Sequence, residues 1–280
     1  MENVVENELK QSARTIRNLT AKCIGNLGVG HIGGSLDLAD LLAVLYFKQM
    51  NVDPARPRME GRDRLICSKG HAGPAIYSAL AAKGYFPEEE LLTLNLIGTN
   101  LPSHCDMNRT TGIDMTTGSL GQGISCAAGI ALGSKLKGDN AWIYAIVGDG
   151  ECEEGQCWEA FMSAAHYKLD HFVVFVDNNR MQIDGTTDEV IGLPPLEDKL
   201  TSFGFHVQTV DGHDVAAIDG AIECAKSVAG KPSAIVLNTI KGKGISFVEA
   251  VGIGNHNMPF TMDDFHKAEA ELTGKECARS

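Results

Sequence analysis

Five short apolar runs alternate along the chain with longer stretches of helical periodicity, and this alternation constrains the fold more than any other feature. The apolar runs are residues 65–67, 142–147, 172–176, 207–210 and 234–237. The helical stretches are residues 72–83, 87–95, 121–137, 153–168 and 214–229. Strands separated by helices of this length form parallel βαβ units. The pattern predicts an α/β fold with a doubly wound, mainly parallel sheet, helices on both faces, and ligand sites at the carboxyl ends of the strands.

The two ends of the chain are predicted to be helical. In residues 5–24, apolar side chains recur every three to four positions, which is typical of an amphipathic helix. Asp37 is expected to open a second helix through residues 38–47, and residues 260–272 form a further amphipathic segment. No internal repeat, low-complexity tract or Pro/Ser-rich linker marks a boundary, so we interpret residues 1–280 as a single domain.

The composition argues against several partners and locations. The chain has 24 Lys and Arg against 36 Asp and Glu, a net charge of -12, so it would attract neither nucleic acid nor an anionic membrane. Its longest apolar runs are far too short to span a membrane, and the N-terminus lacks the basic and apolar regions of a signal peptide. The eight cysteines are scattered and include no C-x-x-C pair. These features predict a cytoplasmic protein.

A literal G-x-G-x-x-G occurs at Gly28, Gly30 and Gly33. A dinucleotide site of this form needs a strand before the glycines and a helix after them, whereas here a long predicted helix comes before them. We therefore interpret the segment as a flexible connection between two helices. A nicotinamide-dependent oxidoreductase remains the alternative reading of this motif.

Polar side chains follow two neighbouring apolar runs. Asp149 lies between two glycines directly after residues 142–147, and Asp177, Asn178 and Asn179 follow residues 172–176. Oxygen ligands from two adjacent strand ends would hold two corners of a Mg²⁺ octahedron, which diphosphate oxygens, a carbonyl and water can complete. Each element alone is more often an ordinary turn or loop start. Together, at this spacing, they predict a magnesium-diphosphate site.

The remaining charged and imidazole side chains are expected to be structural or solvated. No closely spaced ligand pair such as H-E-x-x-H indicates a zinc hydrolase. The histidines expected on the surface or satisfied in the core are His166, His171, His206, His213 and His266. Asp214 is expected to cap a helix. The densest basic group is expected in a solvated loop and comprises Arg56, Arg58, Arg62 and Arg64.

Eight blocks of the sequence, in order, resemble the diphosphate-binding N-terminal domain of transketolases. They are GVGHIGGSLDLADLLAVLYF, SKGHAGPAIYSALAAKG, LPSHCDM, TTGSLGQGISCAAGIALG, GDGECEEGQCWEA, DNNRMQIDG, TVDGHD and TIKGKGISF. The resemblance covers nearly the whole chain and implies the thiamine-diphosphate-binding form of the α/β fold. Its implied cofactors are thiamine diphosphate and Mg²⁺, with Ca²⁺ or Mn²⁺ able to substitute. Deoxyxylulose-phosphate synthases and two-oxoacid dehydrogenase subunits share the GDG and Asn-Asn elements and remain alternatives.

The resemblance also implies a role for each matching position. Asp149 and Asn179 would ligate the metal through their side chains, and Met181 would do so through its carbonyl. The positions that would contact the cofactor are His71, Gly118, Leu120, Gly150, Asn179 and His256. The positions that would act in catalysis are His31, His104 and His256. Glu154 matches an acid at the family's subunit interface.

The implied activity is transfer of a two-carbon ketol unit from a ketose to an aldose, as in the pentose phosphate reactions. Full-length transketolases continue into a pyrimidine-binding domain, which carries the glutamate that activates the cofactor, and into a C-terminal domain, and neither matches any part of this chain. The resemblance therefore implies a partner subunit that carries them, in an α2β2 heterotetramer. The default donor is xylulose 5-phosphate, with unusual phosphorylated or sulfonated ketoses as alternatives. A cofactor-binding module without catalysis is the alternative from another class.

Overall fold

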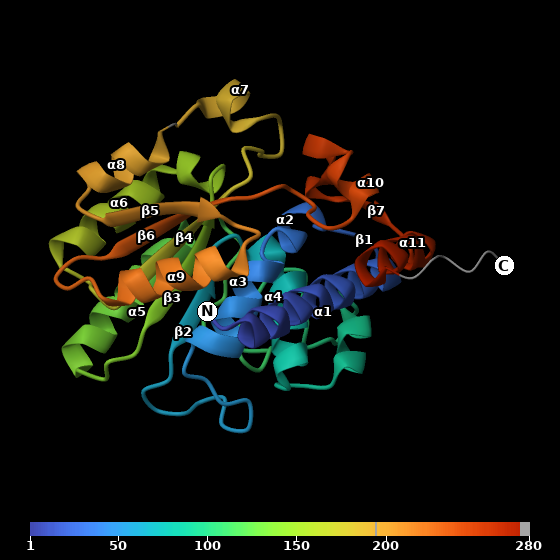
Figure 1. Ribbon diagram of the computed structural model, residues 1–280, viewed down its shortest axis with the longest axis horizontal. Helices are drawn as coiled ribbons and strands as arrows, with labels where there is room; N and C mark the ends of the chain where they lie inside the picture. The colour runs from blue at the N-terminus through green and yellow to red at the C-terminus, as the bar shows by residue number, and fades with distance from the viewer. Residues whose placement is uncertain (194, 275–280) are drawn as a thin grey trace.

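A five-stranded, wholly parallel sheet forms the centre of the molecule (Figure 1). The computed structural model describes residues 1–193 and 195–274. The strand order is β2-β3-β4-β6-β5. The strands are β2 (Arg64–Cys67), β3 (Ile143–Gly148), β4 (Phe172–Asn178), β5 (His206–Asp211) and β6 (Ser233–Asn238). All five predicted apolar runs are therefore confirmed as strands of one parallel sheet.

Helices cover both faces of this sheet, as the doubly wound pattern predicts (Figure 1). One face packs against α1 (Asn3–Leu27), α3 (Ala39–Val44), α4 (Gly73–Lys83) and α9 (Val215–Lys226). The other packs against α5 (Gln122–Lys137), α6 (Gly155–His166) and α8 (Leu196–Ser202). Strand side chains alternate between the two cores: Tyr144 and Ile146 belong to the first, and Ala145 and Val147 to the second. Because both faces of β3, β4 and β6 are buried, these strands read as continuous apolar runs, whereas the edge strand β5 is only partly buried.

Shorter elements complete the connections. They are α2 (Gly33–Leu36), α7 (Thr187–Ile191), α10 (Ser246–Glu249), the π-helical η1 (Leu45–Gln49), and the 3₁₀ turns η2 (Gly70–Ala72), η4 (Glu151–Glu153) and η5 (Gly252–His256). The predicted C-terminal amphipathic segment is α11 (Met262–Thr273), which lies against α1. Asp214 caps α9 as predicted, because its carboxylate accepts from the N–H groups of Ala216 and Ala217. In the described residues, no helix is both long and apolar enough to cross a membrane.

Four local predictions are wrong. Asp37 does not open a helix: it lies between α2 and α3, with its side chain turned inward. Residues 87–95 form the 3₁₀ helix η3 (Glu88–Thr93) rather than an α-helix, and this short helix ends where Leu94 leaves helical geometry with ψ of 124°. Arg62 is not solvated, because it pairs with the buried carboxylate of Asp114.

The fourth correction concerns the G-x-G-x-x-G segment. Its first residues form β1 (Gly28–Gly30), which pairs antiparallel with β7 (Met258–Phe260) in a separate two-stranded sheet. The segment is thus a fixed strand rather than a flexible connection. It also lies outside the parallel sheet, so it does not form the strand-turn-helix unit that a dinucleotide fingerprint needs.

Candidate active site

A cavity of about 290 Å³ opens at the carboxyl ends of the parallel strands. It is lined by segments that directly follow β2, β3, β4 and β6, the edge at which α/β sheets bind ligands. The cavity-lining residues include Gly34, Lys69, His71, Leu120, Asp149, Gly150, Glu154, Asn179, Met181, Lys241 and His256. Most of the predicted site residues therefore meet in one place.

Asp149 and Asn179 meet because the strands that precede them are neighbours in register. Gly148 at the end of β3 is paired with Asp177 at the end of β4. The Asp149 carboxylate accepts from the N–H of Gly150 at 2.9 Å and from the N–H of Arg180 at 2.5 Å. The side-chain oxygen of Asn179 accepts from the N–H of Met181 at 3.0 Å. The Asp149 carboxylate and the Asn179 amide oxygen thus lie at neighbouring strand ends, where the sequence predicted a magnesium site.

The Asp149 carboxyl lies in a buried and acidic environment. Burial, and then the nearby Asp177 carboxylate, raise the pKa of Asp149 to about 7. A cation bound here would stabilise the buried Asp149 carboxylate, because the neighbouring groups balance only part of its negative charge. No cluster of three or more His, Cys, Asp or Glu side chains with metal-binding geometry occurs in residues 1–193 and 195–274. Carboxylate and amide oxygens such as those of Asp149 and Asn179 suit Mg²⁺ or Ca²⁺ better than zinc.

Four histidine rings gather beside Asp149 and Asn179, from two loops and the turns η2 and η5. The ring centroid of His31 lies 5.4 Å from those of His71 and His256 and 5.7 Å from that of His104. The rings of His71 and His256 are 4.8 Å apart. The structure thus brings together the four histidines that the resemblance singled out.

All four imidazoles are neutral at physiological pH. Burial, and then neighbouring cations, lower the pKa of His256 to about 4 and the pKa of His71 well below its ordinary value. Burial lowers the pKa of His31 and of His104 as well. A neutral imidazole can both donate and accept a hydrogen bond, so the cluster can bind hydroxyl groups and exchange protons with them.

Two lysines that sequence reasoning missed also belong to the site. Lys69 forms a buried ion pair with Asp177, and the ammonium group of Lys241 lies 3.4 Å from Nδ1 of His256. Burial, and then Lys69, lower the pKa of Lys241, which lies on the cavity wall. A group of this kind favours an anionic ligand. Both lysines lie in the quoted SKGHA and KGKG blocks, so a charged residue beside a motif glycine was the available signal.

Glu151 is a further residue that the sequence did not single out. Its buried carboxylate accepts from the N–H of Gly121 at 2.9 Å, the N–H of Gly148 at 3.2 Å and the hydroxyl of Ser68. It therefore ties the ends of β2 and β3 to the start of α5. The family resemblance singled out the neighbouring Glu154 instead.

The remaining predicted positions lie around the rim. A Cβ at Gly118 would be 3.2 Å from the His104 ring, so this glycine borders the histidine cluster. Gly150 leaves room for Gln182, since a Cβ there would come within 2.7 Å of the Gln182 Cβ. Glu154 is exposed at the start of α6, at the cavity edge. His213 is structural as predicted, because it contacts Asp40 and accepts from the N–H of Ile240.

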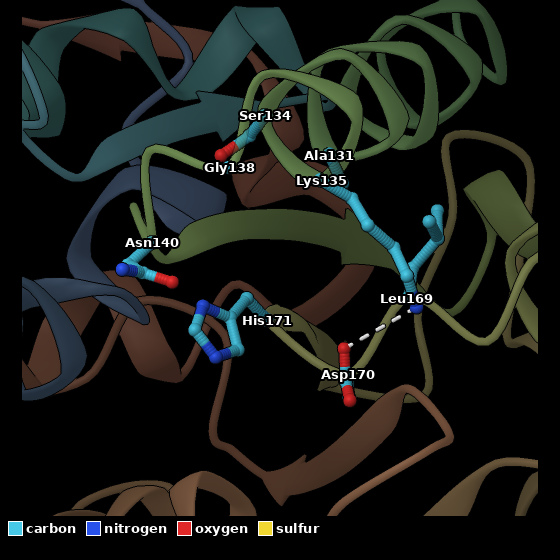
Figure 2. A pocket seen from close by; sticks show the side chains of 8 residues that line it. All are labelled: Ala131, Ser134, Lys135, Gly138, Asn140, Leu169, Asp170 and His171. Carbon is cyan, nitrogen blue, oxygen red and sulfur yellow. Dashed lines mark ion pairs between the residues drawn. The ribbon is translucent and has the colours of Figure 1, made fainter.

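A smaller cavity of about 120 Å³ lies at the opposite edge of the sheet, before β3 and β4 (Figure 2). Its single lysine, Lys135, is paired with Asp170 at 3.5 Å. His171 on its wall stacks on Trp142, with ring centroids 4.4 Å apart. None of the predicted site residues lines this cavity, so the carboxyl edge of the sheet is the candidate active site.

The fold and site together define an α/β protein with a ligand cavity at the carboxyl ends of its parallel strands. The family model described as "Transketolase, thiamine diphosphate binding domain" matches residues 8–277. The chain belongs to this family.

Two relatives match this chain over nearly the full length of both proteins. The 6-deoxy-6-sulfo-D-fructose transketolase subunit of Clostridium sp. (strain MSTE9) is 57% identical over 265 residues, which cover 95% of this chain and 96% of that protein. An apulose-4-phosphate transketolase subunit from Actinobacillus succinogenes is 36% identical over 258 residues, covering 92% and 93%. Both relatives are transketolase subunits of nearly the same length as this chain. The relatives thus support a transketolase subunit that depends on thiamine diphosphate.

The solved transketolases resemble the fold closely over part of their length. The enzyme from Campylobacter jejuni superposes with a TM-score of 0.89 at 31% identity, over 100% of this chain and 44% of that one. The enzyme from Leishmania mexicana gives a TM-score of 0.87 at 30% identity, over 97% and 42%. The chain therefore spans about two fifths of the length of these solved transketolases.

Proposed function

We propose that this chain is the cofactor-binding subunit of a two-subunit transketolase, and that its donor is a sulfonated ketose of the 6-deoxy-6-sulfofructose type. The observation that supports the proposal is that Asp149 and Asn179 border the cavity beside the cluster of four histidine rings. The donor class rests on the relative that is 57% identical over nearly the full length of both chains.

In this proposal, Asp149 and Asn179 hold Mg²⁺ through their side chains, and Met181 holds it through its carbonyl. Calcium or manganese can take the same place. His71, His256 and Lys241 face the diphosphate, and Gly118, Leu120 and Gly150 border the cofactor. The bound thiamine diphosphate supplies the carbanion chemistry of ketol transfer. The protein side chains position it and balance its charge.

His31 and His104 are proposed to act on the substrate, together with His256. Because their imidazoles are neutral, they can hydrogen-bond the hydroxyl groups on the first carbons of the ketose and move protons at these oxygens. A hydrogen bond that strengthens as charge develops on oxygen lowers the barrier to bond breaking.

The proposed partner is a second subunit with the pyrimidine-binding and C-terminal domains, joined to this chain in an α2β2 heterotetramer. Glu154 is exposed at the cavity rim, where a partner side chain could reach it. The seven cysteines that the structure describes are all free, which supports a location in the reducing cytoplasm.

Co-expression with the product of the adjacent gene tests the proposal. The purified pair should transfer a ketol unit from 6-deoxy-6-sulfofructose to an aldose phosphate, with a higher kcat/KM than from fructose 6-phosphate, xylulose 5-phosphate or apulose 4-phosphate. This chain alone should show no turnover with any donor. Turnover by the single chain would overturn the partner requirement, and preference for a phosphorylated donor would overturn the donor class.

A further inference from the structure

Asp37 links two separate parts of the site although it lines no part of the cavity. It lies between α2 and α3, with only 1% of its surface exposed. One carboxylate oxygen accepts from the N–H of Gly242 at 2.8 Å, and the other accepts from Nδ2 of Asn179 at 2.9 Å. Both oxygens accept from N–H donors in this geometry, which favours the carboxylate form, whereas burial, and then the nearby Asp177 carboxylate, raise the pKa of Asp37 above its ordinary value.

The second contact determines which way the Asn179 amide points. Nδ2 of Asn179 lies between carboxylate oxygens of Asp37 at 2.9 Å and Asp177 at 3.2 Å. Carboxylates only accept hydrogen bonds, so the amide nitrogen must face them and the amide oxygen must face away. If the amide turned over, its oxygen would meet two carboxylates. The oxygen therefore stays on the side of the Met181 N–H, toward the proposed cation.

Asp37 contributes more to this orientation than Asp177 does. The Asp177 carboxylate is already engaged, because it pairs with Lys69 through one oxygen and accepts from the Thr239 hydroxyl through the other. The Asp37 oxygen that faces Asn179 has no other hydrogen-bond donor among the described residues. Its contact with Asn179 is also the shorter of the two.

The first contact extends the effect to the opposite wall of the cavity. Gly242 follows the cavity-lining Lys241 and has a φ of +90°, with its N–H aimed at Asp37. A Cβ at this position would come within 2.8 Å of Val248. The turn that carries Lys241 is therefore fixed in place partly by the same carboxylate that orients Asn179.

We propose that Asp37 is a positioning residue: it holds the Asn179 amide oxygen toward the cation and anchors the Lys241–Gly242 turn across from it. This inference rests on the proposed cation site. Outer hydrogen-bond partners of metal ligands typically change metal affinity about 10- to 100-fold when they are removed. Asp37 should therefore influence cation binding without touching the cation.

The test is Mn²⁺ affinity, measured by electron paramagnetic resonance on the assembled two-subunit enzyme with thiamine diphosphate present. Asp37→Asn should weaken Mn²⁺ binding at least about tenfold. The new NH₂ group at position 37 would then face one of the two N–H groups that donate to Asp37 in the unmodified protein. Asp63→Asn is the matched control, since Asp63 is also buried and accepts two backbone N–H groups, from Asn51 and Trp142, at the opposite end of the sheet. Its Mn²⁺ affinity should stay within about twofold of the unmodified enzyme.

A reciprocal exchange separates orientation from a general loss of structure. In the double variant Asp37→Asn/Asn179→Asp, the amide at position 37 donates to a carboxylate at position 179, which still presents an oxygen to the cation. The double variant should bind Mn²⁺ more tightly than either single variant. Additive losses, or unchanged affinity in Asp37→Asn, would overturn the inference alone. Absence of Mn²⁺ binding in the unmodified enzyme would overturn both the proposed function and the inference.

Discussion

Lys69 and Asp177 form an ion pair beneath the cavity, and their side chains are only 3% and 0% exposed. Burial alone would lower the pKa of Lys69, but the carboxylates of Asp177 and Asp37 raise it above its ordinary value. Lys69 therefore stays charged, and it balances part of the negative charge of the carboxylates around Asn179. This buried ion pair stabilises the arrangement of the site residues before any ligand binds.

Removing the ammonium group should therefore destabilise the protein strongly. Lys69→Met leaves the Asp177 carboxylate without its buried cation, and breaking such a pair costs about 3–5 kcal/mol. Lys10→Met is the control, because Lys10 pairs with Glu6 on the exposed surface of α1 and should have no measurable effect. Urea unfolding of the three proteins compares their free energies of unfolding. Equal free energies of unfolding in both variants would show that the pair is energetically unimportant.

Gly70 provides a steric test of how the loops around the site meet. A Cβ at Gly70 would come within 2.7 Å of the Thr117 backbone carbon, and backbone atoms cannot move aside as a flexible side chain can. Gly70→Ala should cost about 1–3 kcal/mol of stability and weaken cofactor binding.

Gly220→Ala is the matched control for this substitution. Gly220 lies in α9, where an added Cβ meets no heavy atom within 4 Å. Alanine should stabilise the helix there by about 0.5–1 kcal/mol. Thermal unfolding should therefore shift in opposite directions for the two alanine variants, and a shift in the same direction would contradict the packing at Gly70.

Cation affinity should depend on pH through Asp149. The pKa of this carboxyl is about 7 in the cation-free fold, above its ordinary value of 3.8. The contribution of this group to the stability of the fold is therefore complete below about pH 3.8 and is lost as the pH rises from there through about 7. A cation needs the carboxylate, so Mn²⁺ affinity should be constant above about pH 8 and should fall about tenfold per pH unit below about pH 6. Titrations that show constant affinity from pH 6 to 8, after correction for free thiamine diphosphate, would contradict the assignment.

His104 should affect turnover without changing the choice of donor. Its ring lies in the histidine cluster that is proposed to face the first carbons of the ketose, which all donors share. None of the described residues that line the cavity is an arginine, so the charged far end of the sugar is expected to meet the partner subunit. His104→Ala should lower kcat by a similar factor for sulfonated and phosphorylated donors. A changed order of preference would place donor selection in this chain.

The sequence predicted the parts of the fold that depend on local pattern. Strands β2, β3, β4 and β6 were predicted because each is a short, mostly buried apolar run, and the edge strand β5 was predicted from residues 207–210 although it is only partly buried. Asp149 and Asn179 were expected to meet because β3 and β4 are consecutive parallel strands, and the register of the sheet does bring their carboxyl ends together. Both inferences need only strand order and periodicity.

Contacts between distant segments could not be predicted in the same way. The pairing of β1 with β7 joins three-residue strands from opposite ends of the chain, too short to show an alternating pattern. Asp37 resembled a helix cap because it precedes an apolar helical run, and only the folded chain shows that it contacts Gly242 and Asn179. The four histidines come from distant segments, so the family resemblance rather than any spacing brought them together.

The most direct test of the account is whether Asp149 anchors the cation and diphosphate while His31 acts on the substrate. Thiamine diphosphate should be titrated calorimetrically, with Mg²⁺ present, into the assembled enzyme and into its Asp149→Ala and His31→Ala variants. Asp149→Ala leaves the diphosphate charge uncompensated, so its cofactor affinity should fall by at least about 100-fold. His31→Ala should keep an affinity within about threefold of the unmodified enzyme while losing turnover. Equal cofactor affinity in the two variants would contradict the assignment of Asp149 as the metal ligand.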